Sequence, residues 1–268
     1  MRTINNWAIG LLTCLIITAG QVYADFTFGT MPDTQNISET DAKGEWIHKM
    51  ALFYTDRKYD LNIRFVASLG DMVQNKTVDA EWVRVKTAYD EFADAMIPFN
   101  PCEGNHDNVN SLNKWFPESE FQSDPFYGYV GKKDGMENSY YTFSADGMDF
   151  IVVVTEYQPT EADLTWASGI FSAHPNHRGI YVTHFAFEAE QRMANENDNV
   201  FLIVFGHDTG WDRGERYYTQ SSTGGNTQHF CMSDYQGRSE AADGAIDWFT
   251  SATPRVLAIK KTGFFGAQ

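Results

Sequence analysis

The stretch P-C-E-G-N-H-D, residues 101–107, follows a short apolar run at residues 96–99 and presents an amide, an imidazole and a carboxylate on one glycine turn. The amide oxygen of Asn105 can ligate a divalent metal, and the imidazole of His106 can give or take a proton near neutral pH. The carboxylate of Asp107 can fix the tautomer of that ring through the other ring nitrogen. We interpret the turn as a functional site, with a polar turn that caps a helix as the alternative for so short a motif.

Four other apolar segments of the chain also end in a residue that can bind a metal. With Asn105, the residues at these ends are Asp33, Asp71, His184 and His207. The binding site of an open α/β sheet lies beyond the carboxyl ends of its strands, so these side chains can converge although they are far apart in sequence. Taken singly, an Asp after Gly is typical of a turn and a His at a strand end is typical of a hydrogen-bonded core residue. Equivalent positions on five segments favour a site.

Helix and strand patterns alternate along the rest of the chain. Helices are predicted from about Asp41, from Thr77 or Asp79 to about Met96, after a capping box at residues 160–163, and at residues 188–195. The side chain of Met96 is expected on the buried stripe of the second of these helices. Further strands are predicted at residues 139–143, 148–154 and 228–235. Residues 109–138 are rich in Asn, Ser, Pro, Gly and aromatic residues, and they predict a long loop over the site.

Length and composition set the class of protein. The chain has 268 residues, of which 43% are hydrophobic, and this is enough for one sizeable core. We therefore expect one α/β domain over residues 25–268. The formal net charge is −16, and the Lys and Arg residues are scattered. Because nucleic-acid binding needs a basic surface, no nucleic-acid polymer is expected as a partner, whereas a small anionic substrate held by metal ions remains compatible.

The first residues predict an export signal. Arg2 precedes an apolar run at residues 7–19, and Val22-Tyr23-Ala24 resembles the ending that signal peptidase cleaves. The run is shorter than the roughly 20 residues of a membrane anchor, so residues 1–24 are interpreted as a signal peptide. The protein is expected to be secreted or periplasmic and to have no membrane association after cleavage. Its oligomeric state stays open, as does a disulfide between Cys102 and Cys231.

The order of motifs resembles a known superfamily. D-T-Q, G-D, G-N-H-D, T-H and G-H follow one another from Asp33 to His207, as in the calcineurin-like metallophosphoesterase superfamily. The P-D-T-Q start, G-H-x-x-G at residues 206–210 and D-Y-Q at residues 234–236 are similar to a group of secreted bacterial members. The resemblance implies an α/β fold in which a two-sheet β-sandwich is flanked by helices.

The resemblance also implies a metal centre. Asp71 would bridge two divalent ions, of which one is also held by Asn105, His184 and His207 and the other by Asp33. The usual two histidines of the second ion are replaced by Gln35, which can offer an amide oxygen, and Thr209. Oxygen ligands alone favour Mg²⁺, Mn²⁺ or Ca²⁺ over zinc there. The expected cofactors are one or two divalent ions, with Mn, Mg, Fe, Zn and Ca as the candidates.

In the same resemblance His106 acts on the substrate and does not bind metal. It would donate a proton to the leaving oxygen or stabilise the transferring phosphoryl group, and Asp107 would orient it. The expected function is a secreted phosphoesterase that hydrolyses a phosphomonoester or a phosphodiester through attack by a metal-bound hydroxide. The alternative is a non-catalytic protein that binds metal or phosphate and keeps the fold with a degenerate second metal site. The sequence does not identify the leaving group.

Overall fold

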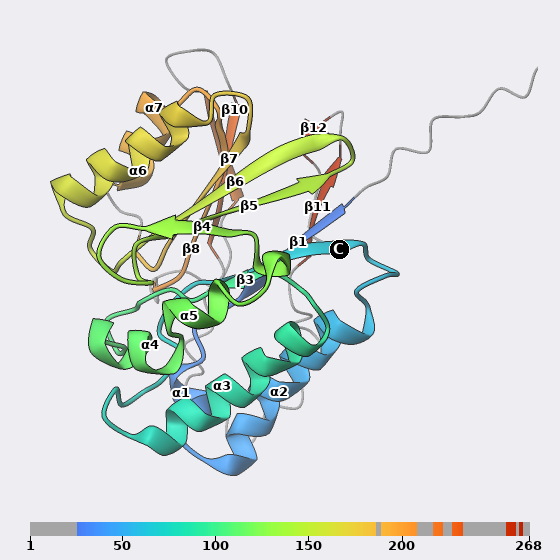
Figure 1. The fold of residues 1–268 in the computed structure, drawn as a ribbon, viewed down its shortest axis with the longest axis vertical. Coiled ribbons are helices and arrows are strands. Elements are labelled where there is room, and N and C mark those ends of the chain that lie inside the picture. The colour runs from blue at the N-terminus through green and yellow to red at the C-terminus, as the bar shows by residue number, and fades with distance from the viewer. Residues whose placement is uncertain are drawn as a thin grey trace, which may run out of the picture.

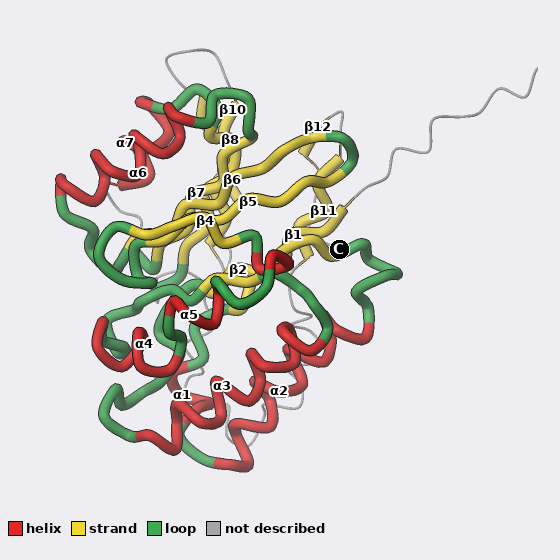
Figure 2. Tube along the Cα trace, in the orientation of Figure 1, coloured by secondary structure: helices red, strands yellow, loops and turns green. Residues whose placement is uncertain are grey.

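Two β-sheets packed face to face form the centre of the computed structural model, which describes residues 26–185, 189–207, 217–221, 227–232, 256–260 and 263–264. Helices lie against the outer side of each sheet (Figure 1), and Figure 2 shows the strands between the two sets of helices. The expected two-sheet sandwich flanked by helices is confirmed. The expected signal peptide at residues 1–24 lies outside the described residues.

The first sheet has the order β12-β11-β1-β2-β3. Its strands are β1 (Phe26–Met31), β2 (Ile63–Ser68), β3 (Phe99–Asn100), β11 (Val256–Lys260) and β12 (Gly263–Phe264). β1, β2 and β3 are parallel, so their carboxyl ends lie at one edge. β11 pairs antiparallel with β1 and β12 with β11. The sequence of this part of the chain shows no sustained alternation and left open whether it adds strands, and the structure places two strands of this sheet there.

The second sheet has the order β4-β5-β6-β7-β8-β10-β9. Its strands are β4 (Tyr129–Lys132), β5 (Ser139–Ala145), β6 (Met148–Thr155), β7 (Arg178–Thr183), β8 (Val200–Phe205), β9 (Tyr217–Ser221) and β10 (Thr227–Met232). β6, β7, β8 and β10 are parallel, whereas β4, β5 and β9 pair antiparallel with their neighbours. β10 confirms the predicted strand as far as Met232, and the rest of that segment lies outside the described residues.

The helices cover both sheets. They are α1 (Gln35–Ser38), α2 (Asp41–Asp56), α3 (Asp79–Asp94), α4 (Val109–Trp115), α5 (Glu118–Phe121), the 3₁₀ helix η1 (Pro125–Tyr127), α6 (Glu161–Ala173) and α7 (Ala189–Glu196). The capping box of α6 is confirmed: Thr160 Oγ1 accepts from the Asp163 N–H, and the Asp163 carboxylate accepts from the Thr160 N–H at 2.8 Å. It satisfies two N–H groups that a helix start would otherwise leave without partners.

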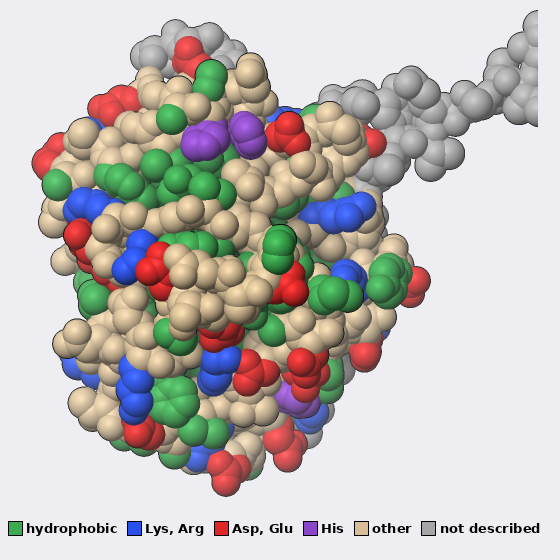
Figure 3. All heavy atoms as spheres, viewed as in Figure 1, with side chains coloured by type: hydrophobic (Ala, Val, Ile, Leu, Met, Phe, Trp, Pro, Cys, Tyr) green, Lys and Arg blue, Asp and Glu red, His purple; other side chains and the backbone are tan. Residues whose placement is uncertain are grey.

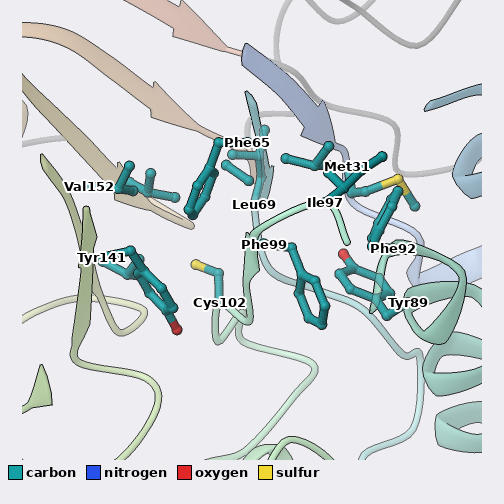
Figure 4. Packing of buried hydrophobic residues seen from close by; sticks show 14 of the residues in the cluster. Met31, Phe65, Leu69, Tyr89, Phe92, Ile97, Phe99, Cys102, Tyr141 and Val152 are labelled. Carbon is teal, nitrogen blue, oxygen red and sulfur yellow. The ribbon is translucent and has the colours of Figure 1, made fainter. Parts of the chain in front are cut away.

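Aromatic side chains fill the space between the two sheets. The Phe65 ring of β2 lies 5.7 Å from the rings of both Tyr141 and Phe143 of β5, and the Phe26 ring of β1 lies 4.9 Å from that of Phe150 of β6. In Figure 4 the ring of Phe65 points toward Tyr141 on the facing strand. Each fully buried side chain of this kind contributes about 1.5–3 kcal/mol through removal from water, so this layer holds the sheets together.

The central strands of the second sheet are buried on both faces. Along β6, Val152 and Val154 belong to the core between the sheets, while Ile151 and Val153 belong to the core beneath α6 and α7. A strand alternates its side chains between two faces, and here both faces are covered, so the sequence reads as a continuous apolar run. These strands form a rigid base for the residues that follow their carboxyl ends.

Two expectations about residues 96–138 are wrong. Residues 109–138 are not one long loop, because they contain α4, α5, η1 and β4. α4 is polar with only Leu112 buried, and its start is capped by Asn108, whose Oδ1 accepts from the Ser111 N–H at 2.7 Å. Met96, expected on the buried stripe of the second long helix, lies beyond the end of α3 and is exposed.

Cys102 carries a free, buried thiol, so the bridge to Cys231 that the sequence left open is not formed here. Among the described residues, no helix is both long and apolar enough to cross a membrane.

Candidate metal centre

The five residues expected at segment ends all follow the carboxyl ends of parallel strands. Asp33 follows β1, Asp71 follows β2, Asn105 follows β3, His184 follows β7 and His207 follows β8. Within each sheet these strands are neighbours, so their ends lie side by side at one edge. The two sheets therefore bring together loops that are more than a hundred residues apart in sequence.

Four of these side chains meet at one ring nitrogen. His184 Nε2 lies 3.2 Å from Asp71 Oδ2, 3.2 Å from Asn105 Oδ1 and 3.1 Å from His207 Nδ1. The ligand atoms of Asp71, His184 and His207 all lie within 4.8 Å of one another. Asp71 and His184 are fully buried, His207 is half-buried and Asn105 is exposed.

The protonation of His184 shows why these atoms need a cation. Its Nδ1 lies 2.7 Å from the Leu69 carbonyl oxygen, which can only accept, so Nδ1 carries the proton and donates. In the neutral ring Nε2 then presents a lone pair to a carboxylate oxygen, an amide oxygen and a second imidazole. Lone pairs at these distances repel unless a cation lies among them. One carboxylate, one amide and two imidazoles fit a divalent ion, and imidazole suits transition metals.

The pKa shifts of Asp71 and His184 agree with this geometry. Burial acts to raise the pKa of Asp71, but the hydrogen bond and charge of His184 outweigh it, so this pKa lies below its ordinary value. Burial acts to lower the pKa of His184, but the hydrogen bond and charge of Asp71 outweigh it, so this pKa lies above its ordinary value. The pair thus favours a positive charge beside Asp71, which either a proton or a metal ion can supply.

Glycines allow the loops to approach one another. Gly70 has a φ of +86°, and a Cβ at that residue would lie 2.7 Å from His184 Nδ1. A Cβ at Gly104 would lie 2.1 Å from the backbone nitrogen of Asp71. Asp71 and His207 themselves have φ values of 47° and 67°, a backbone conformation that costs energy for a residue with a Cβ. The glycines of G-D and G-N-H-D are therefore required by the close packing of the site.

His106 is anchored beside the cluster through two contacts. Its backbone N–H donates to Asp71 Oδ1 at 2.7 Å, and its Nδ1 lies 3.0 Å from the carbonyl oxygen of Gln74. Because that carbonyl can only accept, Nδ1 carries a proton and donates. Nε2 is then the ring atom that can give a proton to a substrate or take one from it. The ring is half-buried and so remains accessible.

The expectation that Asp107 orients His106 requires correction. The carboxylate of Asp107 is buried and accepts from the backbone N–H groups of Gly104 at 3.0 Å, Met72 at 3.1 Å and Val73 at 3.2 Å. Burial and the charge of Asp71 raise the pKa of Asp107 to about 7. Asp107 therefore joins the loop after β2 to the loop after β3, and the partner of the His106 ring is the Gln74 carbonyl.

The residues expected at a second ion lie in the loop after β1. Asp33 is buried and its Oδ1 accepts from the Gln35 N–H at 3.1 Å. The Thr34 N–H donates to the carbonyl oxygen of Asp71 at 3.0 Å, which joins this loop to the cluster. The buried Oε1 of Gln35 has no hydrogen-bond partner among the described residues, so it fits a cation ligand. Thr209 lies outside the described residues.

Tyr157, which follows β6, was not expected at the site. Its ring centroid lies 5.7 Å from that of His184 and 5.3 Å from that of His207, and the residue is half-buried. β6 is the neighbour of β7, so the rule of carboxyl strand ends could have found this residue. Tyr157 belongs to none of the motifs that end in Asp, Asn or His, so the motifs did not indicate it.

The two-sheet sandwich and the cluster of ligand atoms at its strand ends define an α/β protein with a candidate metal centre. The chain belongs to the calcineurin-like phosphoesterase family, whose model matches residues 33–209. The match runs from the first expected ligand to just beyond the last one, so the expected family is confirmed.

Similar proteins are known in sequence and in structure. The uncharacterized protein YvnB of Bacillus subtilis (strain 168) is 24% identical over 245 residues, which are 82% of this chain and 18% of that protein. The 5'-nucleotidase precursor of Thermus thermophilus has a TM-score of 0.55 at 11% identity, over 91% of this chain and 53% of that one. TT1561 of the same organism has a TM-score of 0.53 at 8% identity, over 79% of this chain and 91% of that one.

The two structural likenesses show the fold alone. The chain spans about a fifth of the length of YvnB and about half of the length of the 5'-nucleotidase precursor.

Proposed function

We propose that the protein is an exported, metal-dependent phosphoesterase that hydrolyses a small phosphomonoester or phosphodiester. The observation that carries this proposal is the convergence of Asp71 Oδ2, Asn105 Oδ1 and His207 Nδ1 on His184 Nε2, with His106 held at the edge of the same cluster. A divalent ion held by these residues would neutralise charge on phosphoryl oxygens and activate water for attack.

The residues of the chain supply the remaining steps. Asp71 fixes the position of His106 by accepting its backbone N–H, and the Gln74 carbonyl fixes the ring by accepting from Nδ1. When the ring is doubly protonated, the Nε2 proton can pass to the leaving alkoxide oxygen as the P–O bond breaks. A general acid is needed most when the leaving alcohol is a weak acid. We therefore assign His106 to the departure of the alcohol.

A second candidate function is a non-catalytic protein that binds metal or phosphate. The residues expected at the second ion favour this function, because the loop after β1 offers only Asp33 and the amide oxygen of Gln35, with no imidazole. A weakly held second ion would leave one charged centre at the phosphate instead of two. Such a site could bind an anion without hydrolysing it.

An assay of the pure protein distinguishes the two functions. Nitrophenyl phosphate and bis(nitrophenyl) phosphate, each with added Mn²⁺, Mg²⁺, Ca²⁺ or Zn²⁺, should be tested before and after treatment with a chelator. We expect hydrolysis of at least one ester with at least one ion, and its loss in the chelator. Absence of hydrolysis under every condition, with phosphate still retained by the protein, would select the binding function.

The numbers and kinds of metal-ligating side chains at the two sites predict two ions of unequal affinity. Asp33→Ala should leave the ion at His184 in place and mainly abolish the activation that added metal produces, because Asp33 lies in the loop that would hold the second ion. The measurement is metal content after dialysis, together with activity against added Mn²⁺. Loss of the tightly held ion in Asp33→Ala would contradict this assignment. Gln35→His combined with Thr209→His should tighten the second site if both residues face it.

Export is part of the proposal, and its support comes from the sequence of residues 1–24. Native protein purified from the producing cells should begin at Asp25 or within a residue or two of it, because signal peptidase reads the small residue Ala24. N-terminal sequencing or intact mass tests this. Secreted material that still begins at Met1 would contradict both the signal peptide and the location.

The proposed substrate is a small anion and not a nucleic-acid polymer. On the face drawn in Figure 3, Lys and Arg side chains are interspersed with Asp and Glu. The formal net charge of −16 would repel a polyanion over a large surface, whereas one phosphoryl group at a metal ion is attracted locally.

A further inference from the structure

Two buried carboxylates hold the loop that follows Asp71. The backbone N–H groups of Met72 and Val73 donate to Asp107, and those of Gln74 and Asn75 donate to Glu81. Four successive N–H groups thus point to the two carboxyl groups. The loop carries Asp71 at one end and the Gln74 carbonyl near the other, so the two carboxylates determine its shape.

Glu81 stands in the first turn of α3 and is 3% exposed. Its Oε2 accepts from the N–H groups of Gln74 and Asn75, each at 2.8 Å, and from Ser38 Oγ at 3.2 Å, and its Oε1 accepts from Asn75 Nδ2 at 3.0 Å. It makes no ion pair with any described residue. A buried carboxylate without a cation is costly unless such hydrogen bonds and the positive end of a helix stabilise it.

One peptide group joins Glu81 to His106. The carbonyl of Gln74 and the N–H of Asn75 belong to the same peptide unit. That carbonyl accepts from His106 Nδ1 at 3.0 Å, and that N–H donates to Glu81 Oε2 at 2.8 Å. An anionic acceptor on the N–H polarises the amide and increases the negative charge on its oxygen, so the two hydrogen bonds strengthen each other.

We propose that Glu81 positions His106 through the peptide bond between Gln74 and Asn75. The negative charge holds the Gln74 carbonyl in place and strengthens its bond to Nδ1, which leaves Nε2 directed to the substrate. Glu81 touches neither the substrate nor the cluster, so it is a positioning residue. Its effect on turnover rests on the proposed function of His106, whereas its effect on the His106 ring does not.

The kinetic test is Glu81→Gln, which keeps the size of the side chain and removes its charge. We expect turnover of an alkyl phosphate to fall by about 10-fold or more, the scale of supporting contacts behind a reacting group, with a smaller loss on nitrophenyl phosphate. Metal content and KM should not change. In a His106→Ala background the same substitution should cause no further loss, because its effect passes through the ring.

The matched control is Asp79→Asn in the same turn of α3. Asp79 is exposed, pairs with Lys114 at 2.8 Å and has no bond to residues 74–75, so its loss should not alter turnover. An equal effect of Asp79→Asn, an equal loss on both substrates, or full additivity with His106→Ala would each overturn the proposal. If Glu81→Gln does not fold, Glu81→Asp is the second variant, because it shortens the side chain by one methylene and moves the carboxylate away from residues 74–75. Its loss of turnover should likewise be larger on the alkyl phosphate than on nitrophenyl phosphate.

A second measurement does not require activity. Nitrogen chemical shifts of His106 in labelled protein report how much of the ring carries its proton on Nδ1. We expect that fraction to fall in Glu81→Gln and to be unchanged in Asp79→Asn. An unchanged ring in Glu81→Gln would overturn the proposal. A changed ring in a protein that hydrolyses no ester would support it and would contradict only the proposed function.

Discussion

His184→Ala should remove the tightly held ion and lower phosphoester hydrolysis by about 10³-fold or more. His184 Nε2 is the atom on which the other three donors converge, so no arrangement of the remaining side chains replaces it. A metal acting as a Lewis acid contributes several kcal/mol to the stability of the transition state, and each 1.36 kcal/mol is tenfold in rate. The measurement is turnover together with metal content of the purified variant.

His48→Ala is the control for this substitution. His48 lies on α2, is half-buried and has a carboxylate of Glu91 3.7 Å away, so the variant loses an imidazole without any change at the cluster. We expect normal metal content and turnover. If His184→Ala, folded as judged by its thermal transition, keeps both its ion and its activity, then the cluster around Asp71 is not the metal centre.

His106→Ala should lower turnover of an alkyl phosphate by about 10²-fold or more, the scale of general acid catalysis, and leave metal content unchanged. Its ring donates through Nδ1 to the Gln74 carbonyl, and the ring is not part of the group of ligand atoms that converge around Asp71. The loss should be smaller on nitrophenyl phosphate, because nitrophenolate leaves without a proton. An equal loss on both esters would remove His106 from the role of proton donor.

The sequence predicted those site residues whose position is determined by the end of a strand. Asp71, Asn105 and His184 each follow an apolar segment that forms a parallel strand, and the common direction of such strands brings their ends together. Their spacing in sequence carries no information about distance, but their place after a strand does. Family resemblance added which of them would share an ion.

The sequence misplaced Asp107 because adjacent residues on a tight turn point in different directions. His106 faces Gln74, whereas Asp107 turns toward the backbone of Met72 and Val73. Glu81 was missed for a related reason: its partners are backbone N–H groups, which every residue except proline has. A carboxylate that binds backbone leaves no pairing pattern in a sequence.

Sequence patterns did not predict the short helices and strands either. α4 and α5 are too short to show a helical period, and β4 is a four-residue strand that pairs with β5. β11 joins its sheet through backbone pairing with β1, which is distant in sequence. Such elements form because tertiary contacts stabilise them, and local propensity contributes little. The long helices α2 and α3, with several turns of apolar repeat, were predictable.

Metal analysis of the dialysed wild-type protein tests the account most directly. Asp71, Asn105, His184 and His207 offer two imidazoles and two oxygen ligands, whereas Asp33 and Gln35 add only oxygens at the second site. The protein should therefore retain close to one divalent ion per chain through exhaustive dialysis and bind a second only when metal is supplied. Retention of no ion after prior loading with Mn²⁺ or Zn²⁺, or of two ions with comparable affinity, would contradict the account.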